Sequence, residues 1–116
     1  MIESLLDGIR AEIRRGAHRF TLHAGERMIE RHIAVSEVKE AIISEGCEVI
    51  EDYPDDPRGP SCLIFGMTAK GQPLHVQCSY PPNMAVITAY QPDPSEWIDW
   101  RTRRERGDDE MSILRR

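Results

Sequence analysis

The chain has 116 residues, 40% of them hydrophobic and 30% charged, which is the length of one domain and the composition of a folded chain. No apolar run approaches the roughly 18 residues that a membrane span requires, and the N-terminus lacks a signal-peptide layout, so the sequence predicts a soluble cytoplasmic protein. The three cysteines are widely spaced and include no C-x-x-C pair, which argues against a structural zinc site and a disulfide scaffold.

Apolar residues recur at helical spacing in the first part of the chain and predict three helices. The first covers residues 2–15. An extended segment over residues 19–22 leads to a second helix at residues 23–32, whose Met28 and Ile29 are expected to face the core. The third helix is expected to follow Ser36 as its N-cap and to end at Gly46.

The apolar period then changes from 3.6 to 2, which indicates strands. In the first predicted strand, one face carries Cys47, Val49, Glu51 and Tyr53. Further strands are predicted over residues 61–68, 74–80 and 84–90. The turns between these three strands are short enough for antiparallel hairpins. In the last strand, alternation places Thr88 and Tyr90 on one face with Met84 and Val86.

The segment after the strands begins with a helix-start pattern, in which Asp93 caps, Pro94 occupies the first turn and Glu96 stands at N3. The resulting helix would present Trp97 and Trp100 on one face. We therefore expect an α+β fold, with N-terminal helices packed on one face of a four-stranded antiparallel meander and a short C-terminal helix. Residues 1–106 are expected to form a single domain, followed by a polar C-terminal tail at 107–116.

Two groups of residues have side chains suited to chemistry. His23, Arg27 and Arg31 follow one another at i, i+4 and i+8, so one helix presents an imidazole and two guanidiniums along a stripe, either as an anion site or as a solvated face neutralised by Glu30. On the third strand, His75 and Gln77 share a polar face. No metal-binding motif is recognisable, and the sequence predicts neither a metal site nor a cofactor.

The string His23-Ala-Gly-Glu-Arg-Met-Ile-Glu-Arg31 and the later block Val86-Ile-Thr-Ala-Tyr-Gln-Pro92 resemble a bacterial family, the domain of unknown function DUF4258. The resemblance covers about residues 20–100. That family in turn resembles the BrnT and RelE toxins, small α+β ribonuclease-like proteins of toxin–antitoxin pairs. In BrnT-like proteins the last strand ends in an arginine, where this chain has Tyr90. The resemblance implies an RNA substrate and a zinc-containing antitoxin as partners.

These observations lead to the hypothesis of a toxin-like, metal-independent ribonuclease. Its catalytic residues would be His23 and His75 as acid and base, Arg27 for the phosphate charge, and Tyr90 as a donor. Arg31 and Gln77 would contribute to binding. We expect His23 and Arg27 to line one shallow pocket with Tyr90 or His75 at its edge. The alternative is a non-enzymatic protein- or nucleic-acid-binding module of the same fold.

Overall fold

A computed structural model describes residues 2–104 of the chain, and the predicted tail at 107–116 lies outside them. Three helices and seven strands follow one another along this part of the chain. The helices are α1 (Ile2–Arg15), α2 (Leu22–Arg31) and α3 (Val35–Ile43). The strands are β1 (Arg19–Phe20), β2 (Glu48–Tyr53), β3 (Ser61–Met67), β4 (Pro73–Ser79), β5 (Ala85–Tyr90), β6 (Trp97–Ile98) and β7 (Thr102–Arg103).

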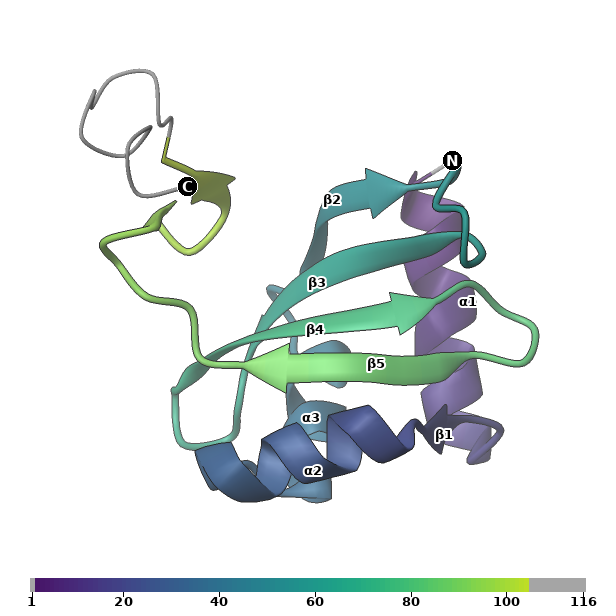
Figure 1. Cartoon of the computed structure of the whole chain (residues 1–116), viewed down its shortest axis with the longest axis horizontal. Coiled ribbons are helices and arrows are strands. Elements are labelled where there is room, and N and C mark those ends of the chain that lie inside the picture. The colour runs from purple at the N-terminus through teal and green to yellow at the C-terminus, as the bar shows by residue number, and fades with distance from the viewer. Residues whose placement is uncertain (1, 105–116) are drawn as a thin grey trace.

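The main sheet has five strands in the order β1-β5-β4-β3-β2, and β1 pairs with β5 in parallel. The three helices lie on one side of this sheet, and α2 runs beside β5 (Figure 1). The α+β class is as expected, but the prediction of a purely antiparallel four-stranded meander is wrong. Strand β1 gives hydrogen-bond partners to main-chain carbonyls at the outer edge of β5. Arg19 N–H donates to the Met84 carbonyl at 3.2 Å, and Thr21 N–H donates to the Val86 carbonyl at 3.1 Å.

The core lies between the helices and the sheet. It takes Leu74, Val76 and Cys78 from β4, so the predicted alternation of that strand is confirmed. From α2 it takes Ala24 and Met28, one helical turn apart. Ile29 is 77% exposed, which corrects the expectation that it faces the core. One residue amounts to about 100° of rotation around a helix, and this turns Ile29 away from the sheet.

Two β-bulges change which side chains face the helices. In β2 the register shifts between Val49 and Glu51, so Val49 opposes the core residue Ile64 while Glu51 opposes Leu63 on the other face. In β5 a shift separates Val86, which opposes Cys78, from Thr88, which opposes Gln77. The expectation that the apolar and polar members of these strands share one face is therefore wrong for both strands.

The predicted C-terminal helix does not form beyond a single turn. Asp93 does cap that turn, since its carboxylate accepts from Ser95 N–H at 2.8 Å and its carbonyl from Glu96 N–H at 2.8 Å. The chain then becomes extended and folds into the hairpin β6–β7, which we call the C-terminal hairpin (Trp97–Arg103). In the turn from Ile98 to Arg101, closed by a 3.0 Å hydrogen bond from Arg101 N–H to the Ile98 carbonyl, the central residues Asp99 and Trp100 have φ values of 52° and 64°. A continuing helix excludes these values, and a type I′ turn requires positive φ at both positions.

Local side chains accept hydrogen bonds from main-chain N–H groups at the starts of α2 and α3. Thr21 Oγ1 accepts from Ala24 N–H at 3.0 Å and caps α2. Helix α3 begins at Val35 with Ala34 in the N-cap position, and not after Ser36 as predicted, because Glu37 reaches back and accepts from Ala34 N–H at 2.8 Å. None of the helices between residues 2 and 104 is long and apolar enough to cross a membrane.

Candidate functional site

The candidate site lies on the sheet face opposite the helices, around His75 of β4. Register places Phe65 of β3 and Tyr90 of β5 on either side of it. Although His75 lies on the face without helices, its side chain is 0% exposed. The C-terminal hairpin provides the cover, since the Trp97 ring meets the imidazole edge to face with centroids 4.4 Å apart.

Both ring nitrogens of His75 are hydrogen-bonded. Nε2 lies 2.6 Å from the Trp100 carbonyl oxygen, and Nδ1 lies 3.2 Å from the Tyr90 hydroxyl. A carbonyl oxygen can only accept, so Nε2 carries the proton and donates it to Trp100. In a neutral ring Nδ1 is then the acceptor, and the Tyr90 hydroxyl donates to it. The main chain of the hairpin thereby determines the tautomer of the imidazole.

Burial favours the neutral forms of both members of this pair. It lowers the pKa of His75 below its ordinary value, and the hydrogen bond to Trp100 offsets this only in part. Burial also raises the pKa of Tyr90. At neutral pH the pair therefore consists of an uncharged imidazole and an intact phenol, so His75 is free to accept a proton through Nδ1.

Side chains from β2 and the hairpin form an ionic cluster beside this pair. Arg103 donates to both carboxylate oxygens of Glu51 at 3.1 Å and lies 4.6 Å from the Trp97 ring centroid. Burial would raise the pKa of Glu51, but hydrogen bonds from Arg103 and Tyr53 lower it overall. Burial and the Glu51 carboxylate together raise the pKa of Tyr53 to about 12. Within this cluster the Glu51 carboxylate raises the pKa of His75, and the Arg103 guanidinium lowers it.

Arg31 brings a guanidinium to the same region from α2. It donates to the Ala89 carbonyl at 2.8 Å and to Thr88 Oγ1 at 3.2 Å, and its Cζ lies 6.0 Å from the Tyr90 ring centroid. The side chain is exposed, so an anion next to Tyr90 could also reach it. Of the predicted site residues, His75, Tyr90 and Arg31 are therefore brought together.

His23 and Arg27 lie apart from this group. His23 is exposed in the first turn of α2, and eight residues separate it from Arg31, or about 12 Å along the helix axis. Arg27 forms an ion pair with Glu30 at 2.7 Å, which agrees with the alternative interpretation of His23, Arg27 and Arg31 as a solvated face neutralised by Glu30. The structure does not bring these two residues to the His75–Tyr90 pair.

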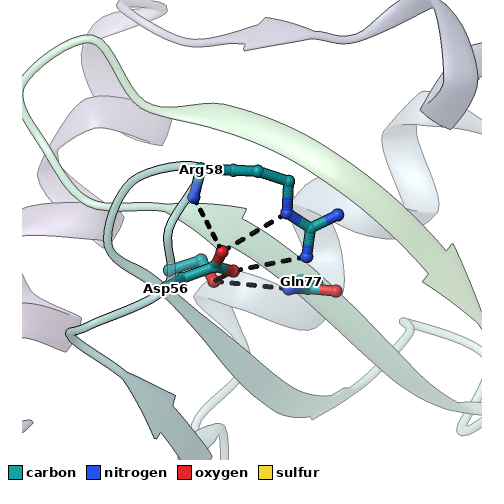
Figure 2. Close-up of polar contacts among 4 residues, drawn as sticks. Asp56, Arg58 and Gln77 are labelled. Atoms are coloured by element: carbon teal, nitrogen blue, oxygen red, sulfur yellow. Dashed lines mark hydrogen bonds and ion pairs between the residues drawn. The ribbon is translucent and has the colours of Figure 1, made fainter.

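Gln77, the remaining predicted site residue, connects β4 to the loop between β2 and β3 (Figure 2). Its amide donates to Ser61 Oγ at 3.3 Å, and Ser61 in turn donates to Asp56 at 3.3 Å. Hydrogen bonds from the Arg58 main chain and guanidinium lower the pKa of Asp56. These contacts satisfy the polar groups of the loop, so Gln77 contributes to the anchoring of a loop.

That loop also lines a shallow hollow of about 450 Å³, formed by residues 52–58. Three aspartates and one arginine border it, a balance that disfavours phosphate. Within residues 2–104, no three His, Cys, Asp or Glu side chains are grouped closely enough to hold a metal ion. The chemistry of the described region is therefore concentrated around His75.

The family model of a domain of unknown function (DUF4258) matches residues 20–91, more than half of the chain. The chain belongs to this family. No curated protein and no solved structure matches it. The expected likeness to the BrnT and RelE toxins has no counterpart in these comparisons and stays a prediction.

The DUF4258 match runs from β1 to the end of β5, and so includes every predicted site residue. It stops before the C-terminal hairpin. The hairpin residues Trp97, Trp100 and Arg103 were not recognised as site residues, and neither was Glu51. One signal was available, because both tryptophans of the chain lie within four residues of each other. Two such side chains in a short segment require a surface to pack on.

Proposed function

We propose that this DUF4258 protein is a toxin-like ribonuclease of the cytoplasm that cleaves RNA without a metal ion, with Tyr90 and His75 as its proton-transfer pair. The proposal rests mainly on the 3.2 Å hydrogen bond between the partly exposed phenol of Tyr90 and the buried neutral imidazole of His75. The predicted likeness to the BrnT and RelE toxins agrees with this proposal and would add a zinc-containing antitoxin as the expected partner.

The residues suggest a specific sequence of proton movements. The 2′-hydroxyl of RNA gives its proton to the Tyr90 oxygen while the Tyr90 proton passes to His75 Nδ1, and the 2′-oxygen attacks the adjacent phosphorus. The bond from phosphorus to the 5′-oxygen breaks, and that oxygen takes a proton from water. The hydroxide that remains takes back a proton from Tyr90 while His75 returns its proton to the Tyr90 oxygen, which restores the neutral pair. The products are a 2′,3′-cyclic phosphate and a 5′-hydroxyl end.

Charge development in this reaction matches the neighbouring groups. The phosphorane-like transition state carries additional negative charge, which Arg31, with its Cζ 6.0 Å from the Tyr90 ring centroid, would stabilise. The Trp100 carbonyl and the Glu51 carboxylate would stabilise the imidazolium formed at His75, against the opposing effects of burial and of Arg103. His23 and Arg27 have no step in this scheme, because they lie along α2 and away from the pair.

The test uses purified protein and a 5′-labelled single-stranded RNA in buffer that contains EDTA. We expect cleavage with cyclic-phosphate ends, slowed by about 100-fold in Tyr90→Phe and in Arg31→Gln. The matched control is Arg14→Gln, which removes an exposed arginine from α1 and should change the rate less than about twofold. Equal rates for wild type and Tyr90→Phe would contradict the proposal, and so would cleavage that requires an added metal.

A second candidate function is RNA binding without cleavage. It is favoured by the complete burial of His75 and by the occupation of both its nitrogens, which leave the imidazole no direct contact with a ligand. In this case Arg31 and two arginines of the hairpin, Arg101 and Arg103, would bind phosphates, and the affinity for RNA would fall steeply as the salt concentration increases. Salt-sensitive binding with no products in the same assay would favour this function over the first.

A further inference from the structure

The C-terminal hairpin is held to the main sheet mainly by side chains. Its two strands pair with each other and form a separate two-stranded sheet, so the hairpin does not extend the hydrogen-bonded ladder of β1 to β5. In Figure 1 it lies beyond the end of β5, at the end of a connecting segment. An element attached in this way can leave the sheet without breaking any strand pairing of the main domain.

Two arginine–carboxylate pairs fasten the hairpin to β2. Arg101 donates to Glu48 at 2.7 Å and lies 4.6 Å from the Phe65 ring centroid, while Arg103 makes the double contact to Glu51. The side chains of the Arg101–Glu48 pair are 43% and 45% exposed, so water and salt weaken it. Trp97, 2% exposed, is the apolar anchor between these pairs and His75. These contacts therefore define one docked position of the hairpin, and the exposed ion pair makes docking weak enough to be reversible.

We infer that docking of the C-terminal hairpin is a switch that turns the His75–Tyr90 pair on, and that undocking turns it off. When the hairpin is docked, Trp100 holds the Nε2 proton, Trp97 keeps water from the ring, and Nδ1 is reserved for Tyr90. When it is undocked, water reaches the imidazole and competes with Tyr90 for Nδ1. The inference rests on the proposed ribonuclease function for its consequence, but docking itself can be measured separately.

Docking is tested by the reaction of histidines with diethyl pyrocarbonate, followed by mass spectrometry of peptides. His23 is exposed and serves as the internal reference in every sample. In the wild type we expect His75 to react at least about tenfold more slowly than His23, because it reacts only when the hairpin opens. Two variants loosen the same contacts from opposite sides, Glu48→Gln with Glu51→Gln, and Arg101→Gln with Arg103→Gln. Both should raise the His75 rate to nearly that of His23.

The consequence for activity is tested with the Arg101→Gln and Arg103→Gln variant, which keeps the Glu51 carboxylate beside His75. Removing two positive charges should weaken RNA binding, and the loss of Arg103 by itself favours the imidazolium, so charge alone predicts a higher KM with an unchanged or higher kcat. The switch predicts the opposite for the chemical step, with kcat about 10- to 100-fold lower. The matched control, Arg14→Gln with Arg19→Gln, alters the net charge equally at two exposed positions and should keep the wild-type kcat.

The outcomes separate this inference from the proposed function. Rapid labelling of His75 in the wild type, or slow labelling in both loosened variants, would overturn the switch whatever the protein does to RNA. An increase of kcat in the loosened variant would also overturn it, because the hairpin would then be a cover that hinders the reaction. Slow labelling of His75 in the wild type and rapid labelling in the loosened variants, with no cleavage of RNA by the wild type, would establish hairpin docking and refute the proposed ribonuclease function.

Discussion

His75 and Tyr90 are register partners on β4 and β5, with their ring centroids 5.3 Å apart and a hydrogen bond from the phenol to Nδ1. This pairing exists only because the bulge in β5 moves Thr88 and Tyr90 to the face opposite the helices. A strand without the bulge would direct the phenol into the core. The polar pair and the hairpin that covers it therefore depend on one irregularity in the sheet.

Replacement of Tyr90 by phenylalanine tests the hydrogen bond through stability. The variant leaves the buried Nδ1 of His75 without a donor, which should lower the free energy of unfolding by about 1–3 kcal/mol. Urea unfolding monitored by circular dichroism measures the loss. Tyr80→Phe is the control, because its phenol donates to exposed Asp52 and water can replace that contact. Equal losses in the two variants would mean that the Tyr90 hydroxyl has no special partner.

The stability of the protein should fall as the pH decreases from about 7.5 to 5.5. Burial lowers the pKa of His75 in the folded state below the ordinary 6.5, so the unfolded chain binds a proton first and is favoured as the pH falls. The stability that neutral His75 contributes is present above 6.5 and is lost progressively toward its folded-state pKa. The slope cannot exceed about 1.4 kcal/mol per pH unit for one proton.

Unfolding by urea at a series of pH values measures this slope in the wild type and in His75→Gln. The slope between pH 7.5 and 5.5 should decrease in His75→Gln and persist in His23→Gln, since His23 faces water in the folded protein. Glu51 does not interfere, because contacts with Arg103 and Tyr53 hold its pKa below 4.5 despite its burial. An identical slope in the wild type and His75→Gln would contradict a buried neutral histidine.

The sequence predicted the three helices and β2 to β5 well, because each has a strong apolar period and clear turn residues between them. It could not predict the bulges, since an extra residue leaves the local pattern of apolar and polar side chains intact. The assignment of His75 and Gln77 to one face of β4 is correct, because the pairing of β4 with β3 is continuous from Pro73 to Ser79. The assignment of Tyr90 to the face of Val86 is wrong, because the bulge lies between them in β5.

The C-terminal helix was predicted from local signals that are real but weak against tertiary contacts. Asp93 forms its cap, yet Trp97 gains more by packing on His75 than by continuing the turn. The partners that decide this segment, Glu48 and Glu51, lie about 50 residues earlier in the chain, at sequence separations of 53 and 52 from Arg101 and Arg103. A local sequence pattern cannot predict contacts between residues that are so far apart in the chain.

Gly66 should not tolerate a side chain. A Cβ at this position of β3 would lie 2.0 Å from the carbonyl oxygen of Ala41 in α3, and neither main chain can move freely because both are buried. Gly66→Ala should therefore cost about 3 kcal/mol or more. Gly25→Ala is the matched control within α2, where no atom lies within 4 Å of the added carbon and the gain should be about 0.5–1 kcal/mol. Thermal unfolding of both variants measures the contrast, and a stable Gly66→Ala protein would contradict the close approach of α3 to β3.

Neighbouring residues of α2 should respond in opposite ways to truncation. Met28 is 3% exposed and packs in the core, so Met28→Ala should lower the free energy of unfolding by about 2–4 kcal/mol. Ile29 is 77% exposed, and Ile29→Ala should change it by no more than about 0.5 kcal/mol, because the lost side chain buries little surface and alanine favours the helix. Urea unfolding of the two variants side by side distinguishes this orientation from the predicted one. A loss in Ile29→Ala comparable to that in Met28→Ala would contradict the exposed position of Ile29.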